Sequence, residues 1–197
     1  MSTETIKITC GIIATVISII SFFPYWKDIL KKKTQPHSYT WLIWTILQVT
    51  GVIVMFNTGA GIGVLALAVG AFVCGSVFIL SLKYGTKNIT PFDTACLIGA
   101  LASTAIYVFL HDPVLSVILL AITDFVGFLP TLRKAYIEPY SETFSLYVLG
   151  IIWSTLNMVA IVTYSLTTVL YPACILFANI ICASVIWFRR KRIPIAH

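Results

Sequence analysis

One carboxylate has an unusual position in the sequence. Asp124 lies about 11 residues into the apolar run 114–132, which is roughly 16 Å along a helix that rises 1.5 Å per residue. In a membrane-spanning helix this depth is near the middle of the bilayer, where a charge costs a few kcal/mol or more and an ionisable residue usually has a function. Asp124 could bind a solute as a hydrogen-bond donor or carry a proton. A packing bond to a neighbouring hydroxyl is the alternative.

Other side chains that can bind a polar ligand occur at similar depth in further apolar runs. Gln48, Trp153 and Asn179 lie near mid-run, and Asn157 lies about one turn further out. Amides can bond to many polar ligands, but they also join membrane helices to one another, with a typical contribution below about 1 kcal/mol. Ligand binding and helix packing therefore both remain open for these four residues.

The composition indicates which elements must position these residues. The 197-residue chain is 59% hydrophobic and only 10% charged, whereas soluble domains are about 25% charged. A bilayer-spanning helix needs about 20 apolar residues, and seven such runs leave only short loops. We therefore predict an all-α integral membrane protein with a single membrane domain over residues 1–197. The predicted spans are residues 8–26, 39–56, 61–82, 92–110, 114–132, 143–164 and 168–188.

The net charge of +6 is distributed unevenly. Basic residues occur in the predicted loops after spans 1, 3 and 5 and in the tail, whereas only Lys7 lies on the other side. This alternation follows the positive-inside rule and predicts a multi-pass protein of the cell (plasma or inner) membrane, with the N-terminus outside and the C-terminus cytoplasmic. It leaves no basic stripe for nucleic acid. The cytoplasmic basic residues are Lys27, Lys31–Lys33, Lys83, Lys87, Arg133, Lys134 and Arg189–Arg192.

Two segments resemble each other and indicate an internal repeat. PYWKDILKKKTQPHSYTW, residues 24–41, and PTLRKAYIEPYSETF, residues 130–144, both start at a proline after an apolar run and end in Pro-x-Ser-x-Thr-aromatic. We predict two parallel three-helix repeats, residues 8–84 and 113–190, joined by a linker helix at 91–111. Such parallel repeats occur in transporters that bind substrate near the midplane between them. In this alignment Ser18 is the counterpart of Asp124, so the site would be chemically asymmetric.

Four prolines, Pro24, Pro36, Pro130 and Pro139, lie near the predicted cytoplasmic ends of spans 1, 2, 5 and 6. A proline inside a helix removes a hydrogen bond and kinks the chain, so this level could act as a hinge or gate. Pro36 and Pro139 could instead start helices. Nearby side chains have simpler interpretations, as N-caps or as aromatic anchors at the membrane interface. The expected caps are Ser38, Thr40, Ser141 and Thr143, and the expected anchors are Tyr39, Trp41, Trp44 and Tyr147.

The order of these features resembles the PQ-loop signature of the SWEET-like transporter superfamily. In that order an apolar helix is followed by a proline, a basic loop and a Ser/Thr pair before an aromatic-rich helix. The resemblance covers essentially the whole chain and is strongest to small prokaryotic members. The Pro-Gln dipeptide itself is absent, because Tyr25 follows Pro24 and Thr131 follows Pro130. The resemblance therefore supports the fold, with its 3+1+3 helices, better than any substrate.

The same resemblance implies that Asn179 and Trp153 contact the substrate. The first repeat has Ala71 and Thr50 at the equivalent positions, so a symmetric stack of two tryptophans on a sugar is not expected.

We therefore expect a facilitator or proton-coupled carrier of a small polar metabolite, such as a sugar, vitamin, nucleoside or amino acid, that works by alternating access. The alternative is a non-transporting receptor or sorting protein resembling the KDEL receptor. No paired carboxylates or nucleophile–base pair occur at one depth, so an enzyme is not expected, and neither is a cofactor or a metal. The expected partners are the lipid bilayer, the solute and, for a coupled carrier, protons; a homo-oligomer is compatible with the sequence.

Overall fold

A computed structural model describes residues 2–57, 64–109, 113–161 and 164–193. These residues form seven α-helices and one short 3-10 helix, and no strand occurs among them. The predicted all-helical class is therefore confirmed. The elements are α1 (Thr3–Leu30), α2 (Ser38–Asn57), α3 (Val64–Tyr84), α4 (Pro91–Phe109), α5 (Pro113–Ile137), η2 (Pro139–Ser141), α6 (Phe144–Ala160) and α7 (Leu166–Arg192).

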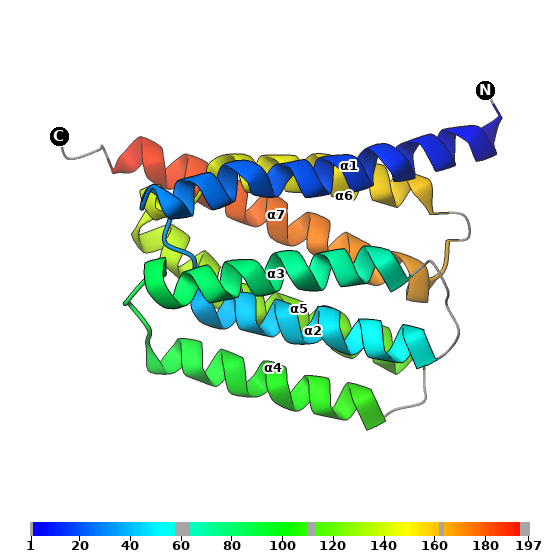
Figure 1. The fold of residues 1–197 in the computed structure, drawn as a ribbon, viewed down its shortest axis with the longest axis horizontal. Helices are drawn as coiled ribbons and strands as arrows, with labels where there is room; N and C mark the ends of the chain where they lie inside the picture. Colours follow the sequence, from blue (N-terminus) through cyan, green and yellow to red (C-terminus); the bar gives the residue numbers. More distant parts are fainter. Residues whose placement is uncertain (1, 58–63, 110–112, 162–163, 194–197) are drawn as a thin grey trace.

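The seven helices lie side by side with their long axes roughly aligned (Figure 1). The connections after α1, α3 and α5 lie at one end, on the left of Figure 1, together with the end of α7. Lys7 belongs to the opposite end, near the N-terminus. The residues expected to mark one side thus gather at one end of the bundle, which is called the basic end below.

Several basic residues that were predicted to lie in loops or in the C-terminal tail belong to helices instead. Lys27 is in α1, Arg133 and Lys134 are in α5, and Arg189 is in α7. The loop prediction was wrong for them because these helices continue beyond the apolar run. In α5 the extension is stabilised by bonds of Arg133 and Lys134 to neighbouring segments.

Neighbouring helices follow the same order in both predicted repeats. In the first triplet α3 contacts both α1 and α2, and in the second α7 contacts both α5 and α6. Between the triplets, α1 packs along α6 and α2 packs against α5. The linker helix α4 packs against α5 and α2.

Two helices of the described chain, Thr3–Leu30 and Val169–Arg192, are long and apolar enough to cross a membrane. Three shorter apolar helical segments, Ala68–Tyr84, Pro91–Ile106 and Phe144–Ala160, accompany them. Large apolar side chains point outward, including Phe109 at 80% and Phe72 at 73% exposure.

The buried core of the basic end is aromatic. Trp41 and Tyr147 are only 2% and 3% exposed, so their predicted role as interface anchors was wrong. Trp44 and Tyr39 are half-buried rather than outward-facing. These rings face inward because they pack on other rings, and Trp41 also donates its indole N–H to the Tyr25 hydroxyl at 3.2 Å.

A candidate solute-binding cavity

A cavity of about 620 Å³ lies between the two triplets. Among the described residues its wall comes from α1, α2, α3, α5, α6 and α7, whereas α4 contributes none. This volume falls within the range of small-molecule sites, which runs from about 300 to 1,000 Å³.

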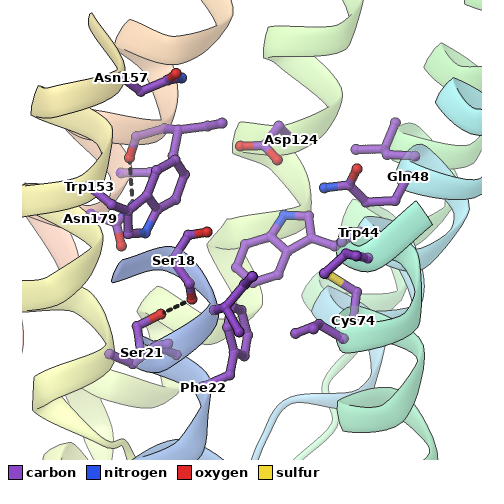
Figure 2. Close-up of a pocket in the computed structure, with 18 of the residues that line it drawn as sticks. Ser18, Ser21, Phe22, Trp44, Gln48, Cys74, Asp124, Trp153, Asn157 and Asn179 are labelled. Carbon is purple, nitrogen blue, oxygen red and sulfur yellow. Dashed lines mark hydrogen bonds between the residues drawn. The ribbon is translucent and has the colours of Figure 1, made fainter. Parts of the chain in front are cut away.

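All six residues predicted to bind substrate line this one cavity, and Figure 2 shows how they lie. They come from five helices, so the fold gathers side chains that are far apart in the sequence. Asp124 is 7% exposed. Asn157 lies on the opposite wall, further from the basic end (Figure 2). The six residues are Ser18, Gln48, Asp124, Trp153, Asn157 and Asn179.

The side chain of Gln48 extends towards the carboxyl group of Asp124 (Figure 2). Its Oε1 is buried and has no hydrogen-bond partner within the described part of the chain, whereas the indole N–H of Trp44 and the Tyr171 hydroxyl both face the Asp124 carboxyl group as donors. Unpartnered buried polar groups are costly. The Gln48 Oε1 is therefore available to a polar ligand.

Two glycines make room for the amide side chains. A methyl group on Gly150 of α6 would lie 2.2 Å from Oδ1 of Asn179, and one on Gly70 of α3 would lie 3.0 Å from Nε2 of Gln48. The Asn179 amide also donates to the carbonyl of Ile175 at 2.9 Å. Asn179 is thus held in place on α7, with its oxygen against α6.

Five aromatic rings close the basic end of the cavity, and we call them the aromatic floor. Their centroids follow one another at 5.9, 5.0, 5.5 and 6.2 Å, within the range of favourable ring contacts. Two of the rings come from the first triplet's α2, one from α1, and one each from α5 and α6. The rings are, in order, Phe22, Trp41, Trp44, Phe128 and Tyr147.

Below the floor lies a buried ion pair that sequence reasoning missed. Nζ of Lys134 is 2.5 Å from Oε1 of Glu142, and both side chains are fully buried. The lysine also donates to the carbonyls of Gln35 and Ser141, and the Tyr147 hydroxyl donates to Glu142 at 2.9 Å. These bonds connect the loop after α1 to α5 and to the start of α6, so they join the two triplets.

A second connection at this level uses hydroxyl groups. The Thr143 hydroxyl donates to Asp28 at 3.0 Å and lies 2.5 Å from the Thr34 hydroxyl. Thr143 is the N-cap residue of α6, as expected, but its side chain makes no capping bond. The Thr131 hydroxyl donates to Thr40 at 2.9 Å, between α5 and α2. The two threonine hydroxyls of the repeated motif, those of Thr40 and Thr143, therefore bond between the triplets.

The linker helix is attached to α5 by charge. Asp93, in the first turn of α4, accepts two bonds from Arg133, at 2.9 and 2.6 Å, and bonds reciprocally with Thr90. His37 is fully buried beside it, with Nε2 at 3.5 Å from Oδ2 of Asp93. Burial lowers the pKa of His37 to about 4, although the Asp93 carboxylate favours the charged form.

The four prolines occupy two kinds of position. Pro24 and Pro130 lie inside α1 and α5, which continue past them. Pro36 precedes α2, and Pro139 begins η2. The helix-starter alternative thus describes Pro139, whereas the hinge prediction for all four remains a prediction.

The lining of the cavity contains few ionisable side chains. Among its described lining residues Asp124 is the one carboxylic acid, and none of them is Lys, Arg or His. The remaining polar groups are amides, hydroxyls and indoles. The site can therefore bind a neutral or cationic solute, whereas an anion would lack a counter-charge.

No protein-family model, no curated protein and no solved structure matches this chain.

Proposed function

We propose that the protein is a membrane carrier for a small polar solute and moves it by alternating access between the two triplets. One observation supports this most directly. The six predicted residues, from five helices, line one cavity between two helix triplets that pack in the same order. In this proposal the substrate site is the cavity itself and the basic end is its closed side. The resemblance to SWEET-like carriers is consistent with this arrangement.

Seven membrane spans are part of the proposal. Each of the seven helices exposes large apolar side chains, which in water would form patches far larger than monomeric soluble proteins tolerate. Lipid would cover them. The gathering of lysine and arginine at one end supports a cytoplasmic location for that end and an outside N-terminus. Examples from α1 to α7 are Ile12, Val49, Phe72, Ile98, Ile122, Ile152 and Phe177.

The lining favours an uncharged or cationic solute over an anionic one, because Asp124 has no cation near it in the cavity wall. Aromatic faces such as those of Trp44 and Trp153 can stack on a flat solute or attract a cation. Protons can couple to transport only if Asp124 exchanges one during the cycle.

The test is thermal unfolding of the purified protein against a panel of metabolites at two pH values, because a ligand of the native state raises the melting temperature. At a concentration of 100 times Kd the stabilisation is about 2.7 kcal/mol. Hits are then assayed for uptake into proteoliposomes. Asp124→Asn should weaken binding of a cationic hit, and Glu138→Gln, a carboxylate outside the cavity, is the matched control. Binding without uptake would favour the receptor alternative. No hit among neutral and cationic solutes would contradict the proposal.

A further inference from the structure

A second, smaller cavity lies at the basic end, away from the solute cavity. It has a volume of about 240 Å³ and is lined by Phe144 at the start of α6 and by Trp187, Arg190 and Lys191 on the last turns of α7. Two of these residues are aromatic and two are cationic. The cavity shares no lining residue with the solute cavity.

The aromatic half lies where a helix would leave the hydrocarbon. The rings of Phe144 and Trp187 stack at 6.0 Å with an interplanar angle of 30°. Trp187 is 51% exposed and its neighbour Phe188 is 62% exposed. Exposed aromatic residues next to a basic cluster at the end of an apolar helix are typical of the headgroup level of a bilayer.

The cationic half is held in place by backbone bonds. Arg190 donates to the carbonyls of Pro139, at 3.1 Å, and Glu142, at 2.6 Å, and its guanidinium lies over the Tyr140 ring at 5.1 Å. The ammonium of Lys191 lies 4.6 Å from the centre of the Trp187 ring. Arg190 is therefore held in place by its bonds, whereas Lys191 is exposed and contacts the Trp187 ring.

These two cations have no carboxylate partner within the described ranges. Glu142 and Asp28 favour the charged form of Arg190, but Glu142 pairs with Lys134 and Asp28 accepts a bond from Thr143. The site thus presents two positive charges that form no ion pair within the described ranges, beside an apolar surface. An anion with an apolar body attached fits this combination better than a free anion does.

We propose that this cavity binds the phosphate headgroup of an anionic phospholipid from the leaflet at the basic end. The phosphate would lie against Arg190 and Lys191, and the glycerol and upper acyl region would lie against Phe144 and Trp187. Basic pockets between helices on the cytoplasmic side bind such headgroups in other membrane proteins. The inference rests on the membrane placement proposed above but on no property of the solute cavity.

The test uses the full chain, purified in a neutral detergent, and follows its melting temperature during titration with phosphatidylglycerol, phosphatidylcholine or inorganic phosphate. We expect saturable stabilisation by phosphatidylglycerol alone. Lys191→Gln should weaken the apparent affinity about fivefold, since one basic residue near an anionic surface contributes about 1 kcal/mol. Lys87→Gln removes the same charge from an exposed loop at the same end, and it should change nothing.

Four results would overturn the proposal. Equal stabilisation by phosphatidylglycerol and phosphatidylcholine would show that the lipid's charge does not matter. Equal stabilisation by inorganic phosphate and phosphatidylglycerol would show that the glycerol and acyl chains do not matter. If Lys87→Gln and Lys191→Gln weakened the apparent affinity for phosphatidylglycerol equally, the lipid would be attracted by the overall positive charge of the basic end and not by a specific site. Stronger stabilisation by polyglutamate than by lipid would favour an acidic protein partner. The assay involves no transport, so its outcome is independent of the uptake experiment.

Discussion

The buried pair of Lys134 and Glu142 allows a stringent test of how the basic end is held together. Glu142→Gln keeps the size of the side chain but removes the charge, which leaves the Lys134 ammonium buried without its counter-ion. Removing one partner of a buried ion pair typically costs about 3–5 kcal/mol. Lys134 keeps its bonds to the carbonyls of Gln35 and Ser141, so we expect the lower part of this range.

In a chain of this size, each kcal/mol changes the melting temperature by roughly 2–4 °C. Glu142→Gln should therefore lower it by about 6–12 °C, working from 3 kcal/mol. A thiol-reactive dye is a suitable reporter because Cys96 and Cys182 are buried and free and do not line the solute cavity, so they react only as the helices separate. The reaction is followed in detergent during a temperature ramp.

Two further variants complete the experiment. Glu138→Gln changes a half-buried carboxylate four residues earlier that forms no ion pair within the described chain, and it should stay within about 0.5 kcal/mol of the parent. Lys134→Met combined with Glu142→Gln removes both charges and should recover at least about 1 kcal/mol relative to Glu142→Gln alone. If Glu142→Gln has the same melting temperature as Glu138→Gln, the Lys134–Glu142 ion pair does not stabilise the basic end and the reasoning fails.

Three other predictions concern the solute cavity and its surroundings. For a neutral solute, Asp124→Asn should retain binding but abolish the pH dependence of uptake in proteoliposomes, and unchanged pH dependence would exclude Asp124 as the proton carrier. Gly150→Ala should displace Asn179, because the added methyl group would lie 2.2 Å from the Asn179 Oδ1. We expect it to weaken solute affinity about tenfold. The control is Gly99→Ala, whose added methyl group meets nothing within 4 Å and should leave affinity unchanged. His37 should make the free energy of unfolding depend on pH, because its pKa falls from 6.5 in the unfolded chain to about 4 in the folded protein. The folded state favours the neutral imidazole. The stability due to the neutral His37 is therefore fully present above about pH 6.5 and is lost as the pH falls towards 4. The loss is on the order of 3 kcal/mol at most, and urea unfolding of His37→Gln should show a flatter dependence between those values than the parent.

The positions of the helices and of the polar lining residues could be predicted from the sequence. Each helix contains an apolar run bounded by charged or turn residues, and an ionisable or amide side chain in such a run usually faces the bundle interior. For this reason Asp124, Gln48 and Asn179 lie in one cavity. The glycines that make room for the two amides could not be predicted, because they belong to other helices and depend on the packing order.

The role of Lys134 could not be predicted either, because in sequence it is simply one of two adjacent basic residues. Successive residues of a helix point about 100° apart, so Arg133 reaches Asp93 on α4 while Lys134 enters the interior. The aromatic residues were misassigned for a related reason. Tryptophans near helix ends are usually interface anchors, and only the packing of Trp41 on Phe22 and Trp44 distinguishes a floor from an anchor.

The aromatic floor has a consequence for the number of states that the protein can adopt. Its rings belong to four helices from both triplets and contact one another in a single series. Three of the four contacts join rings of the same triplet, and the Trp44–Phe128 contact joins the two triplets, so separation of the triplets as units breaks one contact and keeps the other three. Opening of the basic end should therefore be cooperative. Distances measured between spin labels at the ends of α1 and α5 should fall into two separate populations rather than one broad distribution.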